Sequence, residues 1–93
     1  MTEENRSDIG VEEAAEIFNS VSSYNRLYTY LNLGSQKPME ICDDLDLTRS
    51  AMQYYLDDWK ELQLISIEGN EYYYTSKGVE ILTQLQNFVE DEN

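Results

Sequence analysis

Apolar side chains recur at helical spacing between residues 48 and 62. They fall at i, i+3, i+4, i+7 and i+10, which places them on one side of a helix: Met52, Tyr55, Leu56, Trp59 and Leu62. Thr48 suits the N-cap, because its hydroxyl can accept a hydrogen bond from an unpaired N–H of the first turn. The pattern therefore predicts a helix over 48–62 with a buried stripe and an exposed polar side.

A shorter helix is predicted directly before it. Pro38 suits the first helical position, where a missing N–H costs nothing. A narrow apolar edge follows, made of Met39, Ile41, Cys42 and Leu45. Asp46 then stands where the chain must turn, and Leu47 is expected to fill the corner. Because the connection is short, the two helices must cross, as they do in a helix-turn-helix.

Two more helices are predicted upstream. One apolar stripe begins at Val11 with glutamates opposite it, and a second begins at Tyr24, rotated by about 90° from the first. Serines between residues 20 and 23 can cap a new start, so we expect the chain to break or bend there. Gly34 should end the second helix as its C′ residue.

The segment from 64 to 76 has the alternation of a β-hairpin. Isoleucines alternate with polar residues on the first strand, Gly69-Asn70 supplies a tight turn, and Tyr73 lies on the outward side of the return strand. The tip carries Glu68 and Glu71, which phosphate should repel. We therefore do not expect the hairpin tip to contact DNA.

A last helix should start after Thr75. Its apolar residues cover nearly half of its circumference, which is more than a core-facing helix needs. We interpret the surplus as a two-fold homodimer interface, formed with help from the first helix. The residues assigned to it are Ile81, Leu85, Phe88 and Val89. The alternative is that the first helix covers this surplus within one subunit.

The run from Lys37 to Ile65 resembles the winged helix-turn-helix of ArsR/MarR-type prokaryotic regulators, especially small archaeal ones. Their Leu-Gly-Leu-Ser turn corresponds to Leu45-Asp46-Leu47-Thr48, and their Gly-Leu-Ile exit to Gln63-Leu64-Ile65. Aspartate tolerates a left-handed backbone fairly well, whereas glutamine does so less readily. The resemblance implies a mainly α fold with a small β-hairpin wing, extra N- and C-terminal helices, and double-stranded DNA as partner.

In this interpretation the polar side of the 48–62 helix enters the major groove. The DNA-binding residues would be Thr48, Arg49, Ser50, Gln53, Tyr54 and Asp57. Arginine and glutamine can form bidentate contacts to guanine and adenine edges. Candidates for phosphate contacts are Arg26, Lys37, Lys60 and Lys77. The alternative is that the polar residues of the 48–62 helix form only the solvent-exposed side that any amphipathic helix has.

The charge argues against this function. Six Lys and Arg oppose 19 Asp and Glu, a formal net charge of −13, whereas nucleic-acid binders are usually basic on at least one face. One interpretation is an acidic surface adapted to high salt, as in a haloarchaeal or archaeal-virus regulator. The other is a winged-helix protein-interaction module or an acidic DNA mimic. We favour the first, because fold and composition agree with it.

Several classes of function are not expected. Cys42 is the only cysteine and there is no histidine, so neither an internal disulfide nor a zinc site is available, and we expect an inert buried thiol rather than a redox sensor. We also find no phosphate-binding glycine loop or nucleophile motif, and predict no catalytic residues, no cofactor and no enzyme activity.

No apolar run approaches the roughly 18 residues that span a membrane. We therefore expect a cytoplasmic protein with no membrane contact. The sequence predicts one winged helix-turn-helix domain over residues 11–90. A disordered tail is expected over 1–10 and an acidic tail over 91–93.

Overall fold

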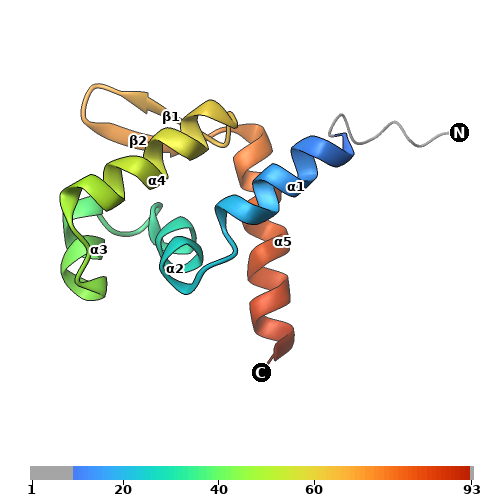
Figure 1. The fold of residues 1–93 in the computed structure, drawn as a ribbon, viewed down its shortest axis with the longest axis horizontal. Helices are drawn as coiled ribbons and strands as arrows, with labels where there is room; N and C mark the ends of the chain where they lie inside the picture. Colours follow the sequence, from blue (N-terminus) through green and yellow to red (C-terminus); the bar gives the residue numbers. More distant parts are fainter. Residues whose placement is uncertain (1–9, 93) are drawn as a thin grey trace, which may run out of the picture.

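The computed structural model describes residues 10–92 (Figure 1). In this range the chain forms five helices and one antiparallel hairpin. Their bounds are α1 Val11–Ser20, α2 Tyr24–Asn32, α3 Pro38–Leu45, α4 Arg49–Glu61, β1 Ile65–Glu68, β2 Glu71–Tyr74 and α5 Ser76–Glu92. The mainly helical fold with a hairpin wing and extra terminal helices is confirmed. Except for Gly10, the predicted N-terminal tail lies outside the described residues.

The central helices begin at the predicted residues. Pro38 occupies the first turn of α3, and the Thr48 hydroxyl accepts a hydrogen bond from the Ala51 N–H at 3.0 Å. Between the helices, Asp46 has φ 58° and ψ 46°, and the next N–H, of Leu47, donates to the Cys42 carbonyl at 3.0 Å. A left-handed aspartate therefore makes the turn.

The end of α4 has the same backbone geometry. Gln63 has φ 64°. Its N–H donates to the Lys60 carbonyl at 3.0 Å, and the Leu64 N–H donates to the Trp59 carbonyl at 2.8 Å, the paired bonds of a Schellman motif. Both positions where the resembled family has glycine are thus left-handed here, although neither residue is glycine.

The break between α1 and α2 is confirmed. Helix α1 ends at Ser20, and the Ser23 hydroxyl caps α2 by accepting from the Arg26 N–H at 3.2 Å. Gly34 follows the end of α2 as expected, but it does not adopt a left-handed conformation. Its role is steric, because a Cβ there would lie 3.1 Å from the ring of Tyr74.

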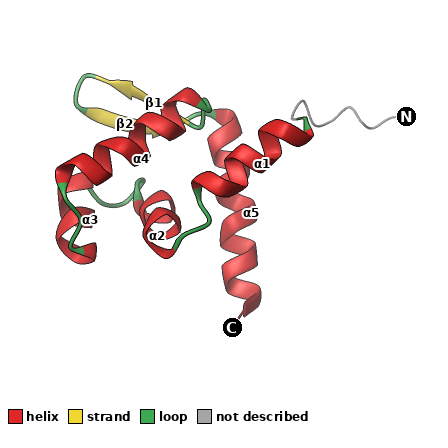
Figure 2. Ribbon diagram, viewed as in Figure 1, coloured by secondary structure: helices red, strands yellow, loops and turns green. Residues whose placement is uncertain are grey.

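The wing is a two-stranded hairpin that lies along α4 (Figure 2). Its register pairs Ile65 with Tyr74 and Glu68 with Glu71. Gly69 has φ 63° and opens the tight turn. Tyr73 is exposed on the outward side, as predicted.

The core is formed by α1, α2, α3, α4 and the wing, with α5 packed against it. Trp59, Tyr30, Ile41 and Leu64 are fully buried in it. The predicted stripe of α4 faces this core, with Met52, Leu56 and Trp59 buried and Tyr55 and Leu62 half-buried. Met39 was expected on the apolar edge of α3, but its side chain is 53% exposed. The buried residues of this helix are Ile41 and Cys42.

Helix α5 crosses the domain and then continues away from it (Figure 1). It packs against the core through Ile81, Leu82 and Leu85, while Phe88, nearer its C-terminus, is 62% exposed. The helix continues to Glu92, so two of the three residues of the predicted acidic tail are helical. Residue 93 lies outside the described range.

Replacing Gln63 with glycine should stabilise the protein. Glycine adopts the observed left-handed backbone without a Cβ penalty, and the expected gain is about 1 kcal/mol, or roughly 4–8 °C in Tm for a domain of this size. The measurement is thermal unfolding followed by circular dichroism. The matched control is Gln84→Gly at an exposed site inside α5, which should lower stability by about the same amount. An unchanged or lower Tm for Gln63→Gly would contradict the assignment.

Candidate nucleic-acid interface

One side of α4 is lined with exposed polar side chains. The buried residues Met52, Leu56 and Trp59 fix the opposite side toward the core. All six residues predicted to contact DNA are exposed: Thr48, Arg49, Ser50, Gln53, Tyr54 and Asp57. The structure therefore brings the predicted set onto one accessible helix face. Thr48 also has a structural role, since its hydroxyl caps the helix.

Charge is unevenly distributed along α4. From residue 48 to 56, Arg49 is the only charged residue, and the carboxylates begin at Asp57. Asp57 accepts a hydrogen bond from the Gln53 side-chain amide at 2.9 Å, and Asp58 pairs with Arg26. The N-terminal half of the helix thus presents a cation and neutral polar groups.

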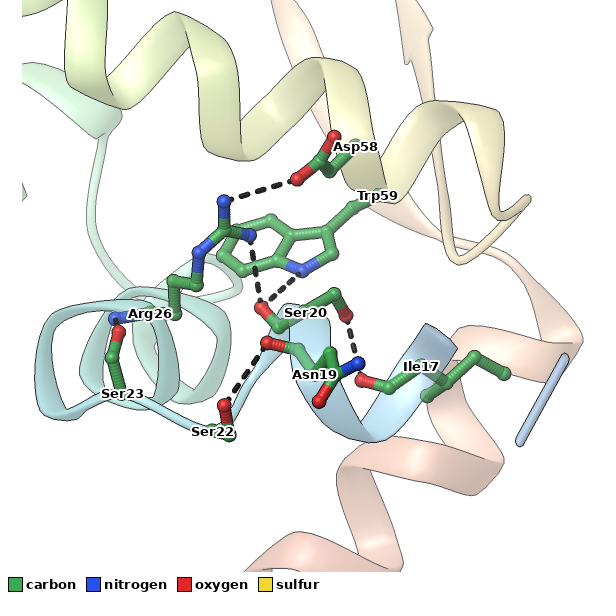
Figure 3. Close-up of polar contacts among 8 residues, drawn as sticks. All are labelled: Ile17, Asn19, Ser20, Ser22, Ser23, Arg26, Asp58 and Trp59. Carbon is green, nitrogen blue, oxygen red and sulfur yellow. Dashed lines mark hydrogen bonds and ion pairs between the residues drawn. The ribbon is translucent and has the colours of Figure 1, made fainter. Parts of the chain in front are cut away.

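Arg26 lies between α2 and α4, over the end of α1 (Figure 3). Its guanidinium pairs with Asp58 at 3.0 Å and donates to the Ser20 carbonyl at 3.2 Å. The guanidinium carbon also lies 5.3 Å from the centroid of the Tyr54 ring and 4.6 Å from that of Tyr55. Sequence reasoning assigned Arg26 to phosphate, but within the fold its contacts are with the protein.

The other predicted phosphate contacts divide into two groups. Lys77, at the start of α5, forms an ion pair with Glu13 of α1. Lys37 precedes α3 and Lys60 lies in the last turn of α4, and both are exposed. In the described part of the chain, no carboxylate pairs with Lys37, Lys60 or Arg49.

The wing tip is acidic and exposed. Glu68 and Glu71 flank the turn, and the Tyr73 hydroxyl donates to a Glu71 carboxylate oxygen at 2.8 Å. This hydrogen bond, together with the carboxylate charge, raises the pKa of Tyr73. The tip therefore offers phosphate a negative surface and no cation.

Cys42 is a buried free cysteine, as predicted. Its side chain is 7% exposed in the core. Burial raises the pKa of the thiol, the neighbouring Asp43 raises it further, and Arg49 opposes this increase. A thiol with a raised pKa forms little of the reactive thiolate at neutral pH.

Two further observations on residues 10–92 concern metal ions and membranes. That part of the chain contains no group of three or more His, Cys, Asp or Glu arranged to hold a metal ion. None of its helices is both long and apolar enough to cross a membrane.

Two crossed helices joined by a tight turn, with one face of the second helix exposed and a hairpin following it, define a winged helix-turn-helix domain. The family model described as "Winged helix-turn-helix" matches residues 20–93, and the chain belongs to this family. It is typically a family of non-enzymatic DNA-binding domains. Helix α1 lies before the matched residues except for its last residue, Ser20. No match was found among curated proteins.

The thiol of Cys42 should react slowly in the folded protein. Burial and the raised pKa both limit attack, so labelling by a thiol-specific disulfide reagent at pH 8 should be at least about tenfold slower than in urea. The measurement is the absorbance of the released chromophore against time. Equal rates with and without urea would show an accessible thiol and would revive the redox-sensor interpretation.

Proposed function

We propose that this protein is a sequence-specific transcription regulator that binds double-stranded DNA with α4 in the major groove. The observation that carries the proposal is the exposed face of α4, whose N-terminal half presents Arg49, Ser50, Gln53 and Tyr54 without a carboxylate. Recognition helices contact base edges mainly from this end. Family membership supports the same function.

Each side chain has a chemical role in this proposal. Arg49 would bind a guanine edge through its two-pronged guanidinium, and Gln53 an adenine edge through its amide. Asp57 holds the Gln53 amide and would accept from cytosine N4 where Gln53 turns toward a base. Lys37 and Lys60 are the better phosphate candidates, since Arg26 and Lys77 already have carboxylate partners.

The acidic surface is interpreted as adaptation to high salt. At a net charge of −13 the protein would repel DNA at low ionic strength. In molar salt the Debye length falls to about 3 Å, so only groups in contact with DNA interact strongly with it. We therefore propose a haloarchaeal or archaeal-virus regulator of ArsR/MarR type that acts in the cytoplasm.

The far half of α5 would form a two-fold homodimer. It extends away from the rest of the subunit (Figure 2), and its apolar residues include Leu85, half-buried, and Phe88, largely exposed. Ile81 and Leu85 already pack against the subunit's own core and would contribute at the edge of the interface, with Val89 nearer the end of the helix. A dimer would present two α4 helices to successive major grooves.

A second candidate is a winged-helix module that binds another protein instead of DNA. An acidic module that imitates DNA would be one case of it. The observation in its favour is the wing tip, where Glu68 and Glu71 stand in place of cations. DNA binding that is lost when residues of α4 are substituted would favour the first candidate over the second.

Arg49→Ala should remove most of the selectivity for the cognate site. Losing one bidentate base contact costs about 1–3 kcal/mol, which is roughly 5- to 150-fold in Kd. The measurement is fluorescence anisotropy on DNA from the gene's own upstream region and on random DNA, from low salt to molar KCl. Lys60→Ala is the contrasting variant and should weaken binding to the cognate and the random DNA equally.

The control for this experiment is Gln84→Ala, on the exposed surface of α5. Full cognate affinity in Arg49→Ala would refute the role of Arg49. If the unaltered protein shows no selective binding at any salt concentration, the protein-interaction candidate takes precedence.

Phe88→Glu should dissociate the dimer. A charge buried at an apolar interface is costly, so the variant should sediment as a monomer where the unaltered protein is a dimer. The measurement is sedimentation equilibrium at several concentrations. Asn87→Glu, a charge one residue away on another side of α5, should leave the dimer intact. A monomeric unaltered protein would refute this interface.

A further inference from the structure

We infer that Arg26 is a positioning residue for the recognition helix, which it holds against α1 and α2 while fixing the ring of Tyr54. The inference rests on the proposed DNA-binding function and adds a residue that does not itself touch DNA. It also gives α1, which precedes the family domain, a part in orienting α4.

The contacts of Arg26 join three helices. Its backbone is at the start of α2, where the Ser23 hydroxyl caps its N–H. Its guanidinium reaches Asp58 on α4 at 3.0 Å and the last residue of α1, Ser20, at 3.2 Å (Figure 3). The side chain is only 15% exposed. A guanidinium held from both sides in this way is not available to a phosphate.

The Ser20 carbonyl is shared by two donors. The indole N–H of Trp59, fully buried on α4, donates to the same oxygen at 3.1 Å. The carbonyl end of α1 is therefore linked to α4 in two ways, directly through Trp59 and indirectly through Arg26, which pairs with the adjacent Asp58. A rotation of α4 about its own axis would therefore break both of these contacts.

Tyr54 connects this cluster to the DNA-binding face. Its ring is 62% exposed and lies 5.3 Å from the Arg26 guanidinium, within the range of a cation–π contact. Tyr55, one residue further, lies at 4.6 Å and is half-buried. The arginine therefore restricts the ring that would lie beside a base.

Lysine cannot reproduce these contacts. A guanidinium is planar, so it can donate in two directions and stack on aromatic rings, whereas an ammonium is a compact point charge. For a phosphate contact the two side chains would be nearly equivalent as charges. Arg26→Lys thus separates a positioning role from an electrostatic one.

The first experiment compares Arg26→Lys with the unaltered protein in the anisotropy assay. We expect cognate affinity to fall roughly tenfold, the size of a lost partly buried cation–π contact with its hydrogen bonds, and random-DNA affinity to stay the same. Combined with Tyr54→Ala, the loss should be less than the sum of the two single losses, because both act through one contact.

Asp58→Asn provides an independent variant. It removes a negative charge from α4, so bulk electrostatics predicts tighter DNA binding, whereas loss of the Arg26 partner predicts weaker cognate binding. The matched control is Glu61→Gln, the same charge change one turn further along α4, where no ion pair is formed within the described chain. Circular dichroism melts confirm that each variant is folded at the assay temperature.

Weaker cognate binding by both Arg26→Lys and Asp58→Asn, with Glu61→Gln equal to or tighter than the unaltered protein, would support the inference. If Arg26→Lys melts below the assay temperature, Asp58→Asn decides alone. Normal binding by these variants, or additive losses with Tyr54→Ala, would overturn the positioning role and leave the proposed function standing. Absence of DNA binding by the unaltered protein would overturn both.

Discussion

The buried aromatic cluster of Trp59, Tyr30 and Tyr74 holds the fold together. Tyr30 meets the other two rings edge-on, at centroid distances of 5.1 and 5.3 Å. Each ring also satisfies its polar atom on another element's backbone: Trp59 on the end of α1, Tyr30 on Gly78 of α5, and Tyr74 on Tyr30 of α2. Burial raises the pKa of Tyr74 to about 12, so its hydroxyl stays a donor. One cluster thus connects both terminal helices, α2, α4 and the wing.

The cluster leaves little room for α4 to shift relative to the rest of the domain. Gly78 shows how close the packing is, because a Cβ there would lie 1.9 Å from the Leu64 carbonyl at the exit from α4. With α4 fixed on its buried side, its exposed side is presented as a rigid surface. Rigid presentation favours selective contacts to base edges, since little conformational entropy is lost on binding. This suits a protein whose charge gives it no general attraction to DNA.

The five basic residues in the described part of the chain differ in their contacts. Arg26 and Lys77 connect elements of the fold through ion pairs, and Arg49, Lys37 and Lys60 are exposed. The acidic residues of α4 begin at Asp57, beyond its first two turns. A strongly acidic composition is therefore compatible with a segment of α4, residues 49–56, that contains one cation and no carboxylate. Net charge alone does not decide between the two candidate functions.

Local sequence patterns were enough to predict the helices, the hairpin and the exposed face of α4. Periodicity reports which side of a helix is buried, and caps such as Thr48 and Pro38 mark where helices begin, because both are local properties of the chain. Only the tertiary structure decided the partners of long side chains. Arg26 meets Asp58, 32 positions later, and Lys77 meets Glu13, 64 positions earlier. The left-handed backbone at Gln63 was decided in the same way, since packing of Leu64 behind α4 outweighs the residue's local preference.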